Sequence, residues 1–92
     1  MTGKKVLLVD DDDALRGSLA EQLRLHEEFE TTVAGTAADG LEIVKNDYFD
    51  AILLDVGLPD MDGREACRLM RRNGVKSPII MLTGADTDAD AI

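Results

Sequence analysis

The sequence predicts an α/β fold, a parallel sheet whose strands alternate with helices. Three observations predict it: aliphatic runs without polar alternation, segments with helical spacing between them, and short connections. A strand that is buried on both faces of a parallel sheet shows such an unbroken apolar run. Regular alternation favours right-handed β-α-β units, and 92 residues leave room for a single hydrophobic core, so residues 1–92 are expected to form one domain.

The first half of the chain is expected to form two strand–helix units. Residues 6–9 are the first aliphatic run, and Asp13 is predicted to cap a helix that carries leucines along one side and ends near His26. Residues 31–33 are β-branched and predict a short strand. Thr36, with an acid three residues later, resembles a capping box and predicts the start of a second helix.

The second half is expected to continue the same alternation. Residues 51–54 form another buried run, and a third helix is predicted to end at Asn73-Gly74, because glycine suits the residue after a helix. Pro78 lies at the first position of a fourth strand that continues through residues 79–82, where a missing backbone donor is tolerated. Asp86 marks the expected start of a further helix. The third helix is lined by Ala66, Leu69 and Met70.

The composition limits the classes of partner. Nineteen Asp and Glu against ten Lys and Arg give a net charge of -9, which repels phosphate backbones and anionic lipids, so no direct nucleic-acid contact is expected. The sequence has no apolar run long enough for a membrane span or a signal peptide, which favours a soluble cytoplasmic protein. The single cysteine excludes an internal disulfide.

Acidic side chains follow the predicted strands at the edge where a parallel sheet binds ligands. Asp10 and Asp11 follow the first strand, Asp55 follows the third and Thr83 follows the fourth. If the first and third strands are neighbours, three carboxylates converge and must either hold protons or share a cation. Mg²⁺ suits such a set and completes its octahedron with phosphate oxygens, so the site indicates phosphoryl chemistry with Asp55 as the nucleophile.

Three motifs, in order along the chain, resemble those of a response-regulator receiver domain. They are residues 6–11 with the Ala-Leu-Arg that begins at residue 14, residues 54–63, and residues 78–84. The resemblance covers essentially the whole chain. It implies a flavodoxin-like fold with the strand order 2-1-3-4-5, which places the first strand beside the third.

The resemblance also implies roles for the acidic residues. Asp55 matches the phosphoacceptor of the family, and Asp10 and Asp11 match its acidic pair, of which Asp11 ligates Mg²⁺ and Asp10 acts mainly through water. The backbone carbonyl of Gly57 matches a further protein ligand. The implied function is to take a phosphoryl group from a sensor histidine kinase or a phosphotransfer protein and to switch partner affinity, without turnover as an enzyme.

The end of the chain is where the match to the family stops. Thr83 matches the switch hydroxyl that approaches the phosphoryl group, and Gly84 keeps the approach open. The sequence ends at Ile92, before the fifth strand, the fifth helix and the phosphate-binding lysine of the family, and neither the Lys4-Lys5 pair nor Lys76 lies at the matching position. The resemblance therefore implies a truncated receiver, and a C-terminal output domain outside this chain is compatible with it.

Truncation predicts self-association. Without a fifth strand, the strand at residues 79–82 is an exposed sheet edge. Without a fifth helix, part of the Leu15, Leu19 and Leu23 side of the first helix loses its cover. We therefore expect the 92-residue chain to self-associate.

Three other classes of function compete with the phosphoacceptor. A phosphohydrolase of the haloacid dehalogenase type needs a second aspartate two residues after the nucleophile, where Gly57 stands. A flavin or nucleotide carrier needs glycines after the first strand, where residues 10–13 are all aspartate. A receiver-like interaction module that is never phosphorylated stays open, because the family's lysine is absent.

Overall fold

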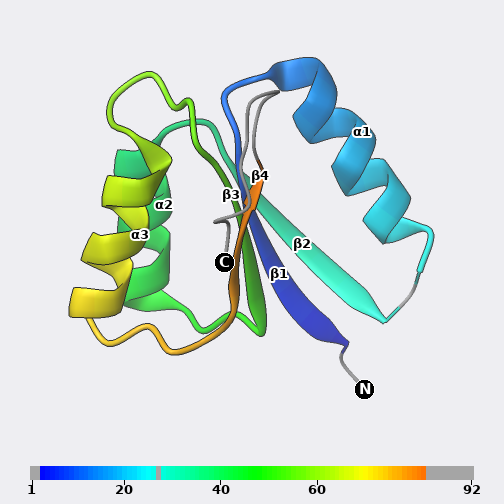
Figure 1. Cartoon of the computed structure of the whole chain (residues 1–92). Coiled ribbons are helices and arrows are strands. Elements are labelled where there is room, and N and C mark those ends of the chain that lie inside the picture. Colours follow the sequence, from blue (N-terminus) through cyan, green and yellow to red (C-terminus); the bar gives the residue numbers. More distant parts are fainter. Residues whose placement is uncertain (1–2, 27, 83–92) are drawn as a thin grey trace.

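A computed structural model gives the structure of the chain and describes residues 3–26 and 28–82 (Figure 1). Strands and helices alternate along these residues. The elements are β1 (Lys4–Val9), α1 (Asp13–Arg24), β2 (Phe29–Ala34), α2 (Ala37–Asn46), β3 (Ala51–Asp55), α3 (Gly63–Arg72) and β4 (Ile79–Leu82). No helix in residues 3–26 and 28–82 has the length and apolar character to cross a membrane. The helix expected from Asp86 lies outside the described residues.

The sheet is parallel, and its strand order is β2-β1-β3-β4. The resemblance to receiver domains implied this order for the first four strands, with the first strand beside the third, and the order is confirmed. Val9 pairs with both Ala34 and Leu54, so β1, β2 and β3 finish at the same edge of the sheet. Asp55 is the last residue of β3 and pairs with Leu82 of β4. The carboxyl ends of all four strands therefore lie together.

The helices lie in two layers, one on each face of the sheet (Figure 1). α2 and α3 cover one face and enclose the main hydrophobic core. Leu7 and Val9 of β1 and Ile52 and Leu54 of β3 point into that core, together with Met70 of α3, and each is 1% exposed or less. The residues that alternate with these core residues along each strand face the opposite helix layer. Each strand is therefore apolar along its whole length and not only at every second position.

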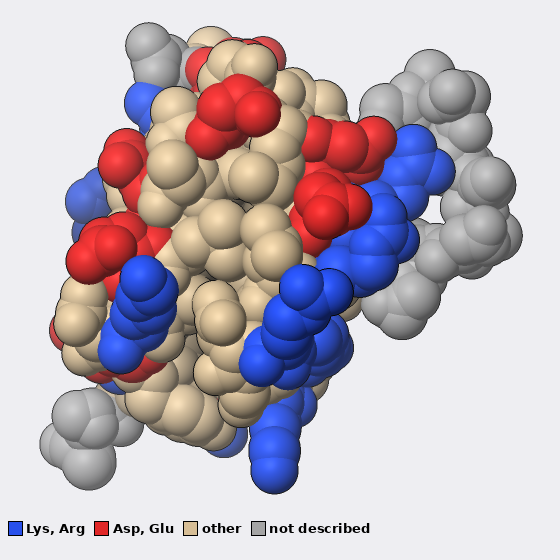
Figure 2. All heavy atoms as spheres, turned by 90° about the vertical axis from the view of Figure 1, so that its left-hand side faces the viewer, with Lys and Arg blue, Asp and Glu red and all other residues tan. Residues whose placement is uncertain are grey.

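The outer side of the α2–α3 layer is polar. Figure 2 looks onto that side of the molecule and shows basic side chains gathered along one border, with acidic ones close by. Arg64 of α3 pairs with Asp62 and Arg68 pairs with Glu65, with N–O distances of 3.3 and 2.9 Å. Exposed ion pairs of this kind contribute little to stability.

The opposite face is covered only by α1 in the described part of the chain. α1 packs on β2 and β1 and contacts neither β3 nor β4 there. None of its described side chains is buried, and Leu15 is 41% exposed. Val33, Leu8, Leu53 and Ile80 form one cross-strand row, and by alternation with the core residues they point to this face. Leu8 is buried, whereas Val33 and Ile80 are exposed.

Local signals at the helix ends explain most of the boundaries. The Thr36 hydroxyl accepts a hydrogen bond from the Asp39 amide at 3.1 Å and caps α2 as predicted. Gly74 has φ 96° and ends α3, as the Asn-Gly pair indicated. The predicted cap of α1 was wrong by one residue: Asp12 is the N-cap, and its carboxylate accepts from the Leu15 amide at 3.1 Å. Four consecutive aspartates give the sequence no means of choosing between neighbours.

Candidate functional site

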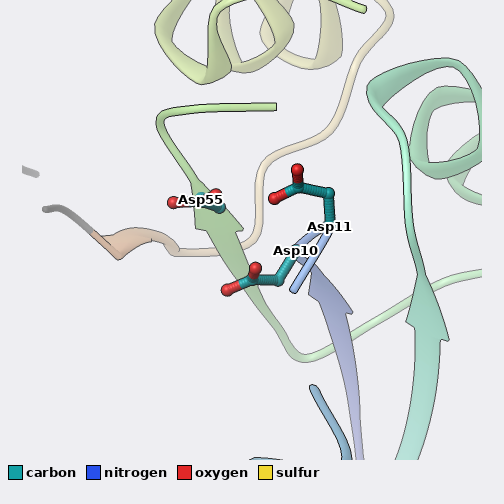
Figure 3. A group of neighbouring side chains, drawn as sticks. All are labelled: Asp10, Asp11 and Asp55. Atoms are coloured by element: carbon teal, nitrogen blue, oxygen red, sulfur yellow. The ribbon is translucent and has the colours of Figure 1, made fainter. Parts of the chain in front are cut away.

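Three carboxylates meet at the carboxyl ends of β1 and β3. Asp10 and Asp11 directly follow β1, and Asp55 ends the neighbouring β3. Figure 3 shows the three side chains around a common space. One oxygen from each carboxylate lies within 4.8 Å of the others. The convergence that the sequence predicted is confirmed for these three residues.

Asp10 is the most firmly held of the three. It is 2% exposed, and its backbone N–H donates to the Ala34 carbonyl of the neighbouring strand at 3.0 Å. Its carboxylate accepts from the Asp12 amide at 2.9 Å, which links it to the cap of α1. The Arg16 guanidinium donates to the Asp10 carbonyl at 2.8 Å. Backbone and side chain of Asp10 are thus both fixed by hydrogen bonds.

The Arg16 guanidinium fills the space between the loops that follow β1 and β2. A Cβ on Gly35, after β2, would lie 3.0 Å from the Arg16 Nη1, so glycine leaves room for the cation. The sequence pattern did not predict this contact of Arg16 with the Asp10 carbonyl. An arginine six residues after an aspartate is a common spacing, and this spacing alone does not predict a contact between the two residues.

Burial and neighbouring charges disfavour the ionised form of Asp55. Burial raises the pKa of this carboxyl above its usual range, the negative charge of Asp10 raises it further, and Asp11 adds a smaller effect. Hydrogen bonds from the backbone amides of Gly57 and Val56 lower the pKa and offset part of this rise. Without a cation the ionised cluster is therefore unfavourable at Asp55, as expected for like charges at short range.

The loop between β3 and α3 folds back on itself beside Asp55. Gly57 and Asp62 form an isolated antiparallel bridge, and the Gly63 amide donates to the Val56 carbonyl at 2.8 Å. Gly63 lies so close to the Asp55 carbonyl that a Cβ there would overlap it. Gly57, whose carbonyl the resemblance assigns to the metal, lies on this loop and is exposed.

Asp60, on the same loop, binds the N-terminus of α2. Its two carboxylate oxygens accept from the Ala37 and Ala38 amides, each at 2.9 Å. These hydrogen bonds, Ala37 first, hold the pKa of Asp60 below its usual range. Spacing and periodicity do not predict this contact, because the partners lie 23 and 22 residues earlier in the chain and no local pattern joins them.

The remaining predicted site residues stay untested. Thr83 and Gly84 lie outside the described residues. Leu82, the last described residue, pairs with Asp55, and Thr83 follows it in the chain. The donor set of three carboxylates matches the oxygen ligands that Mg²⁺ prefers, so the residues present suit that ion.

The sequence of the chain also matches a known protein family. The model of the response regulator receiver domain matches residues 6–92. The chain belongs to this family. Receiver domains are the input domains of two-component signalling proteins, and the acidic cluster of this receiver lies at the edge of the sheet where the resemblance placed it.

Curated relatives of this receiver are response regulators. Response regulator MprA of Mycobacterium leprae is 38% identical over 88 residues, which cover 96% of this chain and 38% of the relative. Response regulator MprA of Mycobacterium ulcerans is 36% identical over the same shares. The receiver therefore spans little more than a third of the length of these relatives.

Solved structures of the family share the fold. A CheY-like receiver domain protein from Methanospirillum hungatei is 38% identical with a TM-score of 0.80, over 92% of this chain and 67% of that chain. TrrA from Thermotoga maritima, solved in complex with Mg²⁺ and beryllofluoride, is 29% identical with a TM-score of 0.83, over 90% and 71% of the two chains. The flavodoxin-like fold expected from the sequence is confirmed.

Proposed function

We propose that this receiver accepts a phosphoryl group on Asp55, with Mg²⁺, from a phosphohistidine of a sensor histidine kinase or of a phosphotransfer protein. The observation that carries the proposal is the convergence of three carboxylate oxygens within 4.8 Å at the ends of β1 and β3. Asp55 is the proposed nucleophile, because it ends β3, while Asp10 and Asp11 at the end of β1 are the proposed acidic pair for the metal. The proposed location is the cytoplasm.

The acidic pair is proposed to hold the cation together with Asp55 and the Gly57 carbonyl. A bound Mg²⁺ supplies positive charge that offsets the repulsion at Asp55 and screens the incoming phosphoryl oxygens. Asp11 is the proposed direct ligand, and the buried, hydrogen-bonded Asp10 acts mainly through water. TrrA, a response regulator solved in complex with Mg²⁺ and beryllofluoride, supports the choice of Mg²⁺ as the cation.

Phosphoryl transfer is a displacement at phosphorus. A carboxylate oxygen of Asp55 forms the new O–P bond as the N–P bond to the donor histidine breaks, and the electron pair of that bond stays on the imidazole nitrogen. The Thr83 hydroxyl is proposed to donate a hydrogen bond to the transferred group, and Gly84 to leave its approach open. The resulting change in partner affinity is the proposed output.

The test combines metal binding with a phosphoryl analogue. We expect Mg²⁺ to shift the NMR signals of residues around Asp55, Asp11→Asn to weaken Mg²⁺ binding strongly, and beryllofluoride to bind only when Mg²⁺ is present. Phosphorylation by a donor should disappear in Asp55→Ala. Failure of beryllofluoride to bind the wild-type receiver would favour the alternative, an interaction module that is not phosphorylated.

The longer relatives suggest what lies beyond this receiver. Because the chain covers 38% of the MprA relatives, we propose that it works together with an output domain. Its own surface is acidic, so nucleic-acid contacts, if the output makes them, belong to that domain. Self-association of the 92-residue chain stays a prediction, and the exposed apolar side chains of Val33 and Ile80 support it.

A further inference from the structure

Asp60 fastens the loop that follows Asp55 to a helix from another part of the chain. The first N–H groups of a helix have no partner within the helix. In α2, the local cap Thr36 accepts from Asp39, whereas Ala37 and Ala38 donate to Asp60. The N-terminus of α2 is therefore capped twice, once from its own sequence and once from the β3–α3 loop.

The same loop carries Gly57, whose carbonyl is proposed as a metal ligand, and Gly57 itself makes no described contact with α2. Gly57 is exposed, and a Cβ at that position would have no atom within 4 Å. The Gly57–Asp62 bridge closes the base of the loop without joining it to α2. Beyond that base, Leu58 and Met61 pack against the hydrophobic core, and the carboxylate of Asp60 is the described hydrogen-bonding link from the loop to α2.

We propose that Asp60 is a positioning residue for metal binding: by tying the β3–α3 loop to α2, it fixes the Gly57 carbonyl before the cation arrives. This inference rests on the proposed function, in which Gly57 contributes a ligand. A ligand that is held in place in advance loses less freedom when the ion binds. Reciprocity then requires that Mg²⁺ strengthens the contact between Asp60 and the amides of Ala37 and Ala38.

The experiment compares the Mg²⁺ dissociation constant of four forms of the receiver, measured by NMR titration. Asp60→Ala removes both acceptors and should weaken binding about tenfold, the low end of the effect of groups that orient metal ligands. Asp60→Asn retains one oxygen acceptor and should lie between Asp60→Ala and the wild type. Thr36→Ala is the matched control, because it removes the local cap of α2 and leaves Asp60 in place. It should bind Mg²⁺ as the wild type does.

Hydrogen exchange gives a second measurement. The change in amide exchange rate on adding Mg²⁺ reports the link between Asp60 and the metal site, and not the stability of α2 alone. Saturating Mg²⁺ should slow exchange of the Ala37 and Ala38 amides in the wild type and in Thr36→Ala, and leave these rates unchanged in Asp60→Ala. If Asp60→Ala does not fold by circular dichroism, Asp60→Asn decides the question with the same two measurements.

The outcomes separate the inference from the function on which it rests. No Mg²⁺ binding by the wild type would contradict the proposed function itself. Tight binding by the wild type with equal affinity in Asp60→Ala would overturn the role of Asp60 alone. Equal weakening in Asp60→Ala and Thr36→Ala would also overturn it, because Asp60 would then act only by stabilising α2.

Discussion

The two faces of the sheet differ in how many apolar side chains they bury and in how they relate to the acidic site. The face under α2 and α3 holds the main core, with Leu7, Leu54 and Met70 fully buried. On the other face, α1 buries none of its described side chains, and the row from Val33 to Ile80 is exposed at both ends.

The α1 face of the sheet is also the face toward which two of the site carboxylates point. Val6 and Leu8 point to the α1 face, and so by period does Asp10. Leu53 does so on β3, and Asp55 follows it with the same orientation. The main core thus lies on one side of the sheet, and Asp10 and Asp55 point by alternation to the side that α1 covers. A domain arranged in this way can place repelling charges at the site without disturbing its main core.

The largest expected effect is a difference between the faces for the same substitution. Leu54→Ala empties a fully buried position in the α2–α3 core and should cost about 2–5 kcal/mol. Leu15→Ala removes a side chain that is 41% exposed and should cost less than about 1 kcal/mol. Urea denaturation of both variants measures the difference. Equal losses would show that the α1 face holds the fold as strongly as the core does.

A smaller effect of opposite sign is expected at the acidic end of the sheet. Because the folded pKa of Asp55 is raised, the ionised carboxylate destabilises the fold, so Asp55→Asn should raise the melting temperature at pH 7 without Mg²⁺ by a few degrees. The stabilisation from protonated Asp55 is complete below the unfolded pKa of about 3.9 and is lost as pH rises through the raised folded pKa. The gap between the variants should therefore close in acid.

Mg²⁺ provides the control for this prediction. An ion that binds the folded state stabilises it by mass action, about 2.7 kcal/mol at a concentration 100 times its dissociation constant. The wild type should therefore gain more from Mg²⁺ than Asp55→Asn does, and the order of melting temperatures should reverse. A wild type that is already the more stable without Mg²⁺ would contradict the raised pKa of Asp55.

The α2–α3 layer should respond to acid in the opposite sense, through Asp60. Its folded pKa is lowered by the Ala37 and Ala38 amides, so its contribution is present above the unfolded pKa of about 3.9 and is lost as pH falls through the lowered folded pKa. Asp60→Asn, which does not titrate, should lose less stability between pH 4 and pH 2 than the wild type, a range set by that reference value. Thermal melts across this range measure it, and parallel curves would count against it.

The smallest effect on stability is expected on β4, at the exposed edge of the α1 face. Ile80→Lys replaces a side chain that is 49% exposed and should change stability by no more than about 0.5 kcal/mol. A lysine at a sheet edge should nevertheless reduce self-association, which light scattering at high concentration measures. Tyr48→Lys, at a position 66% exposed between α2 and β3, is the control and should leave association unchanged. A monomeric wild type would refute the prediction.

The parts of the structure that depend on local sequence were predicted well. Aliphatic runs located the buried strands, and Thr36 and Gly74 fixed helix ends, because each signal involves residues that are neighbours in the chain. The site was predicted in part, because parallel strands bring their carboxyl ends to one edge whatever the details of packing.

The parts that depend on distant partners were missed. Asp60 binds amides 22 and 23 residues earlier, and Arg16 reaches the Asp10 carbonyl around the start of a helix. Neither contact follows from spacing or periodicity. The strand at residues 31–33 was predicted too short, since Phe29 and Ala34 join β2 by pairing with Lys4 and Val9 of β1. Pairing of that kind is a property of the sheet and not of the segment.

The close approach of Gly63 to Asp55 has a mechanical consequence. Most neighbouring elements in a protein meet through side chains, which can turn and so absorb a small displacement. Here the first residue of α3 meets the backbone of the proposed phosphoacceptor directly, with no room for a side chain between them. A shift of the Asp55 carbonyl toward α3 cannot be taken up by rotation of a side chain at this contact. The first turn of α3 should therefore shift together with the Asp55 backbone.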